Sequence, residues 1–141
     1  MKERNKFSLA QYKNKFIEFI KITDHKILAS WSIDCVERVM PYFEKKYPQD
    51  QRPRHAIETL QAWIATGKFK MSTIRSASLS SHAAAREIGE DNAARSVARA
   101  AGQAVATAHV PTHAIGGAIY ALQAIFRANT PTEANLAVEK E

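Results

Sequence analysis

Arginine and histidine side chains in the second half of the sequence recur at helical spacing, and these residue types are well suited to binding anions. Arg95, Arg99 and His109 fall within about 80° of one another when successive residues are placed 100° apart around a helix. Gly102 and Ala106 share this stripe, so long polar side chains stand beside very small ones. Guanidinium groups that converge in such a place bind a carboxylate or a phosphate through paired hydrogen bonds.

Further polar residues at matching intervals extend this pattern to other segments. If the helices that carry them face one another, their side chains line one polar pocket for a small molecule or an anion. Under a second interpretation, they form a network of ion pairs and hydrogen bonds that sets helix register without adding net stability. The residues concerned are Asp34, Arg38, Ser78, His82, Arg86, His113 and Tyr120.

Signatures of metal, cofactor and nucleophilic chemistry are missing. His109 and His113 have the four-residue spacing of zinc ligands on one helix, but Pro111 interrupts that helix. The sequence contains no glycine-rich phosphate loop and no nucleophile elbow. Cys35 is the single cysteine, and its apolar neighbours predict a buried, unreactive thiol. We therefore expect no metal, no cofactor and no catalytic residue, and an enzyme is the less favoured class.

Helical periodicity predicts an all-α domain that positions these residues. No stretch shows the alternation of a β-strand, and Pro and Gly fall mostly between helical segments. Asp24 is placed to cap the second segment, Pro41 to end or kink it, and Gly67 to end the third. Six helices are expected, over about residues 8–21, 24–40, 53–66, 72–88, 91–108 and 111–128, with 42–47 as a last turn or a separate short piece.

The last three expected helices are rich in alanine, and glycines lie inside two of them. A link of about two or three residues joins the fourth helix to the fifth, which predicts antiparallel packing. Gly102, Gly116 and Gly117 each cost roughly 1 kcal/mol relative to alanine in a helix. A close approach of helix backbones would offset this cost, so we expect a bundle with tightly packed C-terminal helices. An uncovered face of small residues would also suit a homodimer.

The net charge of +6 belongs to the first half of the chain. Residues 1–70 contain 14 basic and 8 acidic residues, whereas residues 71–141 contain 6 of each. These basic residues are scattered and lack a recognition-helix signature, which makes nucleic-acid binding the weakest alternative. No apolar run resembles a membrane span or a signal-peptide core, so we expect a cytoplasmic protein. The expected organisation is a basic N-terminus over 1–7, one helical domain over 8–128 and a tail over 129–141 with the signals of a short helix.

An ordered series of short motifs resembles a known family. Over about residues 24–128, the chain is similar to the immunity-protein-five-like proteins of bacterial polymorphic toxin systems. The resemblance implies a small all-α protein that binds and neutralises a toxin, with Arg52 and Arg54 as a candidate partner surface. The matching motifs are Asp34-Cys35-x-Glu37-Arg38-Val39-x-Pro41, Arg52-Pro53-Arg54, Ser81-His82-Ala83-Ala84-Ala85-Arg86, Ala94-Arg95-x-x-Ala98-Arg99 and Ala108-His109-Val110-x-x-His113.

Three functions therefore stay open at the level of sequence. The first is toxin binding through a protein–protein interface. The second is an anion-binding or small-molecule-binding protein, or an enzyme, that uses the Arg/His pocket. The third is weak nucleic-acid binding. The directions in which Arg95, Arg99 and His109 point separate the first two.

Overall fold

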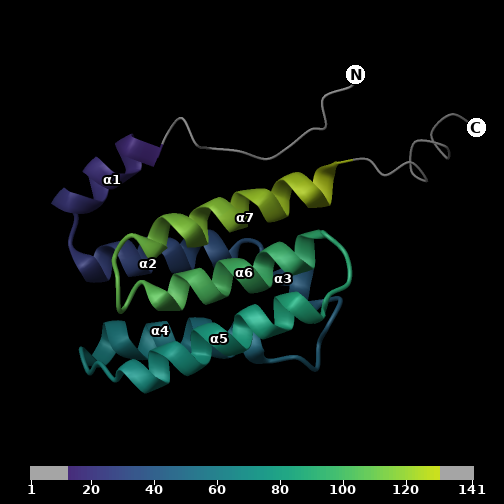
Figure 1. Ribbon diagram of the computed structural model, residues 1–141, viewed down its shortest axis with the longest axis horizontal. Coiled ribbons are helices and arrows are strands. Elements are labelled where there is room, and N and C mark those ends of the chain that lie inside the picture. The colour runs from purple at the N-terminus through teal and green to yellow at the C-terminus, as the bar shows by residue number, and fades with distance from the viewer. Residues whose placement is uncertain (1–12, 131–141) are drawn as a thin grey trace, which may run out of the picture.

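The computed structural model describes residues 13–130, and within this range the chain is all-α, as predicted. It has seven helices there rather than six, because the short piece that contains Pro41 is a helix of its own. The predictions for residues 1–12 and 131–141 lie outside the described residues. The helices are α1 Lys13–Ile22, α2 His25–Glu37, α3 Met40–Glu44, α4 Arg52–Thr66, α5 Met71–Glu87, α6 Ala93–Ala106 and α7 His113–Asn129 (Figure 1).

Local signals place the ends of the first helices. The Asp24 side chain caps α2 by accepting hydrogen bonds from the backbone N–H groups of Lys26 and Ile27. Pro41 has no N–H to donate and lies in the first turn of α3, which explains the break after α2. Gly67 follows α4 with φ of 69°, the left-handed conformation predicted for it.

The junction between α6 and α7 differs from the prediction. Helix α6, which corresponds to the fifth predicted helix, ends at Ala106 rather than near residue 108. Helix α7 begins at His113 rather than at Pro111. The segment between them forms turns, in which the Val110 N–H donates to the Ala106 carbonyl. The start of α6 was predicted correctly, since Asn92 caps it by accepting from the backbone N–H of Arg95.

The helices form two layers with α6 at the centre. In Figure 1, α5, α6 and α7 lie side by side in front, and α2, α3 and α4 lie behind them. Helix α6 packs against α7, α5, α4, α3 and α2. Hydrogen bonds from Ser81 to Ala98 and from Ser78 to Gly102 run in opposite order along α5 and α6, which confirms their antiparallel packing.

Small residues let these helices approach closely, as predicted. Ala98, Ala101 and Ala104 on α6 are fully buried. A Cβ added at Gly117 on α7 would overlap the Ser32 Oγ of α2, so this position has room only for hydrogen. Gly117 therefore serves packing rather than helix propensity.

Two hydrophobic clusters hold the layers together. The larger cluster contains residues from all six helices α2 to α7, among them Phe43, Leu60 and Val97. The smaller one joins α1, α2 and the start of α7 through Ile20, Leu28, Ala114 and Ile115. In the described part of the chain, no helix has both the length and the apolar character needed to cross a membrane.

Candidate functional site

One pair of predicted site residues is directly linked across α5 and α6. Arg99 Nη1 lies 2.9 Å from His82 Nδ1, and both side chains are partly buried. A guanidinium group can only donate hydrogen bonds, so His82 Nδ1 accepts and the neutral ring carries its proton on Nε2. The structure therefore assigns the tautomer of His82 through its partner.

The surroundings of His82 keep its ring uncharged. Burial, followed by the positive charges of Arg99 and Arg86, lowers the pKa of His82 to about 4. Protonation would put an N–H opposite the Arg99 guanidinium and remove the acceptor that Arg99 uses. Near neutral pH, His82 thus acts as a hydrogen-bond acceptor and is too weakly basic for efficient proton abstraction.

Gly102 provides the space for the His82 ring. A Cβ at this position would lie 2.6 Å from His82 Nε2 and 2.8–2.9 Å from two ring carbons, which is closer than unbonded atoms pack. Ser78 Oγ donates to the Gly102 carbonyl at 2.9 Å and holds α5 at the same level. The small residue on the predicted arginine stripe therefore accommodates a side chain of the neighbouring helix.

Arg95 and Arg99 line a shallow cleft between α6 and α7. The cleft has a volume of about 260 Å³, and Arg95 Nη1 donates to Asp91 Oδ1 at 2.9 Å on one side of it. Tyr120 on α7 was expected in the polar pocket, whereas Gln123 and Arg127 were not predicted, although spacings of three and four residues place all three on one helix face. The lining residues are Asp91, Arg95, Arg99, Tyr120, Gln123 and Arg127.

The other predicted site residues on α5 and near the start of α7, which are Arg86, His109 and His113, each have different surroundings. His113 Nδ1 lies 2.8 Å from Gln103 Oε1, and burial, with a smaller contribution from His109, lowers the pKa of His113. His109 is exposed and stacks against the ring of Phe69. Arg86 is also exposed, and its charge acts on the neighbouring α5 histidine.

Asp34 and Arg38 lie apart from the arginine cleft, at a groove between α2 and α7. This groove has a volume of about 400 Å³, and its walls are mainly apolar. Both charged side chains are exposed, and they form no ion pair with each other within residues 13–130. Cys35 also lines the groove, and burial raises the pKa of its thiol although the Arg38 charge lowers it. The thiol therefore stays protonated at neutral pH.

The predicted polar residues thus do not share one pocket: Arg95 and Arg99 line one hollow, and Asp34 and Arg38 line another. Helix α5 packs against α6 and α4, whereas α2 packs against α7 and α6. The structure brings Arg95, Arg99 and His82 together and leaves Asp34 and Arg38 beside the apolar groove. Helix order along the chain does not reveal this division, because it depends on which faces of α6 and α7 each neighbour covers.

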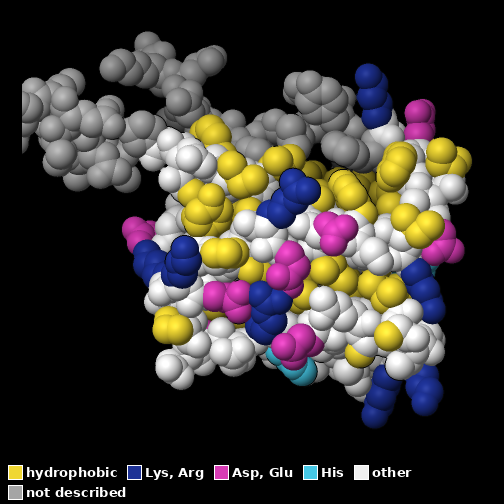
Figure 2. Space-filling model, turned by 180° about the vertical axis from the view of Figure 1, so that it is seen from behind, with side chains coloured by type: hydrophobic (Ala, Val, Ile, Leu, Met, Phe, Trp, Pro, Cys, Tyr) yellow, Lys and Arg dark blue, Asp and Glu magenta, His cyan; other side chains and the backbone are white. Residues whose placement is uncertain are grey.

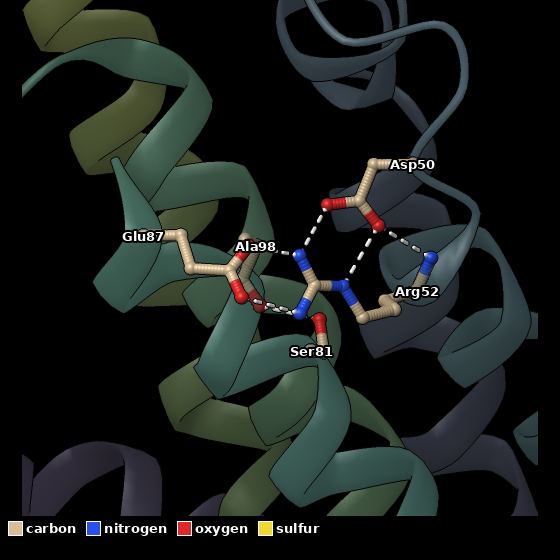
Figure 3. Close-up of polar contacts among 5 residues, drawn as sticks. All are labelled: Asp50, Arg52, Ser81, Glu87 and Ala98. Atoms are coloured by element: carbon tan, nitrogen blue, oxygen red, sulfur yellow. Dashed lines mark hydrogen bonds and ion pairs between the residues drawn. The ribbon is translucent and has the colours of Figure 1, made fainter. Parts of the chain in front are cut away.

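Arg52, the first candidate for a partner surface, is held by two carboxylates of the same chain. Its guanidinium lies between Asp50 and Glu87, with Nη2 2.7 Å from Asp50 Oδ2 (Figure 3). The hydrogen bonds from Arg52 hold the pKa values of both carboxyl groups below their usual range. Arg52 therefore ties the loop before α4 to the end of α5.

Arg54 has a corresponding role within the layer formed by α2, α3 and α4. Its guanidinium donates to Glu44 of α3 through two nitrogens and pairs with Glu37 at the end of α2. On the face seen from behind, acidic and basic side chains lie side by side (Figure 2). Such neighbouring opposite charges leave fewer free cations on that face than the net charge suggests.

Comparisons with known proteins identify the family to which the chain belongs. A family model described as Imm-5 like putative immunity protein matches residues 18–141. The chain belongs to this family, as the sequence motifs indicated. No curated protein and no solved structure matches it significantly. Within residues 13–130, no three His, Cys, Asp or Glu side chains gather as a metal-binding group.

Proposed function

We propose that this protein is a cytoplasmic immunity protein that binds a bacterial toxin and neutralises it through a protein–protein interface. The observation that carries the proposal is the family match, which extends over residues 18–141. The net charge of +6 favours a toxin that is acidic overall, because opposite charges on two proteins speed their encounter.

The apolar groove between α2 and α7 is the toxin-binding surface in this proposal. Its walls include Trp31, Ile115 and Ile119, and Leu122 and Ile125 at its edge are 44% and 41% exposed. Burying such side chains contributes roughly 25 cal/mol for each Å² removed from water. The groove therefore offers a hydrophobic driving force that the charged surfaces lack.

Asp34 and Arg38 supply charges of both signs at the rim of this groove. An apolar centre with a polar rim is the usual anatomy of a protein interface. Arg52 and Arg54 already pair with carboxylates of their own chain, so their charges are less available to a partner. The matching toxin segment presents an apolar side chain flanked by one basic and one acidic group.

Bacterial growth provides the test. Cells expressing the toxin domain encoded beside this gene are supplied with the wild-type protein, Leu122→Glu or Leu79→Glu. Leu122 lines the groove, whereas Leu79 on α5 is 56% exposed and lies outside it. We expect the wild type and Leu79→Glu to restore growth and Leu122→Glu to fail, because a charge in the groove opposes burial.

Thermal melting of the two variants first confirms that both fold. Equal protection by Leu122→Glu and Leu79→Glu would place the toxin on another surface, and no protection by the wild type would contradict the function for that toxin.

Sedimentation of the free protein tests whether a second copy of the chain occupies the groove instead of the toxin. If a second copy covers the groove, the wild type sediments as a dimer and Leu122→Glu as a monomer.

A further inference from the structure

The cleft between α6 and α7 gathers hydrogen-bond donors that lack acceptors. Arg99 uses Nη1 for His82, and its other N–H groups have no acceptor within residues 13–130. The Tyr120 hydroxyl and the Gln123 amide nitrogen likewise form no hydrogen bond with the described residues. Arg99, Tyr120 and Gln123 thus bring donors from two helices to one hollow, and the Asp91 carboxylate at its side accepts from Arg95 rather than from them.

A buried serine orients the α7 side of this cleft. Ser96 is fully buried, and its hydroxyl accepts from Arg127 Nη1 at 3.0 Å and donates to Gln123 Oε1 at 2.8 Å. Because the oxygen of Gln123 is occupied, its amide nitrogen remains as a donor. The arrangement therefore holds Arg127 and Gln123 in defined positions before any ligand arrives, which lowers the entropic cost of binding.

The charge of the cleft selects among anions. Arg95, Arg99 and Arg127 bring three positive charges, and Asp91 brings one negative charge. Asp91 is 73% exposed, and its Oδ1 lies 2.9 Å from Arg95 and 3.9 Å from Arg127. The neutral His82 ring adds no charge. Two uncompensated positive charges match a phosphate monoester, which carries about −1.5 to −2 at pH 7, better than a single carboxylate.

The size of the cleft agrees with a small ligand group. At about 260 Å³, it is smaller than the roughly 300–1,000 Å³ of pockets that enclose a drug-sized molecule. Its lining contains no aliphatic side chain that would hold an apolar ligand. The geometry points to a binding site for a phosphate dianion, either free or as a monoester, held by Arg95, Arg99 and Arg127 with Tyr120 and Gln123 as neutral donors. This site does not depend on toxin binding.

Calorimetric titration of the full chain with inorganic phosphate at constant ionic strength tests the site. We expect saturable binding of one phosphate per chain. Arg99→Gln should weaken it about tenfold or more, because a charge-assisted donor is lost while an amide remains for His82. Asp91→Asn should strengthen binding, because the competing carboxylate is removed. The opposite signs of these two effects distinguish the site from loss of folding.

Matched controls change the same charges elsewhere. Arg75→Gln removes an exposed arginine of α5, and Glu90→Gln removes an acidic side chain next to Asp91, both outside the cleft lining. Both should leave the affinity unchanged. If Arg99→Gln does not fold, Arg95→Gln replaces it, because Arg95 pairs only with the exposed Asp91 among the described residues.

Adenosine monophosphate, adenosine and acetate identify the chemical group that the cleft prefers. Tighter binding of adenosine monophosphate than of inorganic phosphate, with none of adenosine, assigns the site to a phosphorylated small molecule; equal binding assigns it to phosphate itself. Acetate should bind more weakly than either. The proposal is overturned if phosphate does not saturate, if acetate binds equally well, or if Arg75→Gln weakens binding as much as Arg99→Gln.

Discussion

His82 on α5 accepts a hydrogen bond from Arg99 on α6 at 2.9 Å, and this bond is possible only while the imidazole is neutral. The same ring rests against Gly102, one turn further along α6. A polar contact and a steric fit therefore fix one side chain between two closely packed helices. The stability of the helix pair consequently depends on the protonation of His82 and on the absence of a side chain at residue 102.

Acid should destabilise the fold through His82. Its pKa is about 4 in the folded protein and near 6.5 in the unfolded chain. Between these two pH values His82 is protonated in the unfolded chain but neutral in the folded protein. The free energy of unfolding therefore has its full value above pH 6.5 and falls as the pH drops toward 4. We expect a loss of about 1 kcal/mol between pH 7.5 and pH 5, since solvent partly screens the ring. Urea unfolding at both pH values measures it.

His82→Asn is the control for this pH dependence. Asparagine can present an oxygen to Arg99 but does not titrate, so the stability of the variant should change less between the two pH values. His25, His55, His109 and His113 remain in both proteins and cancel in the difference. An equal change in the wild type and the variant would show that other groups cause the acid sensitivity.

Gly102→Ala should lower the free energy of unfolding by about 1–2 kcal/mol, because overpacking costs typically 1–3 kcal/mol and the gain in helix propensity returns part of it. The added methyl group would press on the His82 ring, which Arg99 holds from the other side. Denaturant unfolding measures the effect.

Gly116→Ala provides the comparison for this substitution. A Cβ at Gly116 would meet Oε1, Cδ and Cγ of the Gln103 side chain, which has more rotatable bonds than the His82 ring and can shift, although its Oε1 also lies near His113 Nδ1. We expect its stability to lie within about 1 kcal/mol of the wild type. If Gly102→Ala and Gly116→Ala are equally stable, close packing of the His82 ring does not explain the glycine at residue 102.

Arg54→Met should destabilise the contact of α4 with α2 and α3. Arg54 is 25% exposed and pairs with Glu37 and Glu44, so its removal leaves two carboxylates without their partner. We expect a loss of about 1–2 kcal/mol, reduced by the partial exposure of the carboxylates. Lys46→Met removes a cation whose contact with Glu90 is largely exposed, and its melting temperature should not change measurably. Equal effects of the two substitutions would contradict the structural role of Arg54.

Cys35 should react slowly with thiol reagents in the folded protein. Burial raises the pKa of its thiol, and the reactive species is the thiolate. Alkylation at pH 8 should therefore be slower than in the urea-unfolded chain, with the reaction followed by mass spectrometry. Because Cys35 is the single cysteine, the rate reports on one site. Equal rates in the folded and unfolded chains would show that the thiol is freely accessible.

Most helices could be predicted because their signals are local. Asp24, Asn92 and Gly67 act on backbone groups a few residues away, so the sequence contains both partners. The start of α7 was misjudged because proline at residue 111 suits either a first helical turn or the turn that precedes one. Gln123 and Arg127 were overlooked because their role depends on the α6 residues opposite them.

The sequence alone determined the all-α class, the family and the small-residue faces, since periodicity, capping and composition are properties of neighbouring residues. It also placed Arg95 and Arg99 on one stripe of a helix. Only the tertiary structure decided that this stripe meets Tyr120, Gln123 and Arg127 rather than Asp34 and Arg38. Helical periodicity sets the direction of a side chain around its own axis, whereas packing across the bundle sets which helix stands opposite.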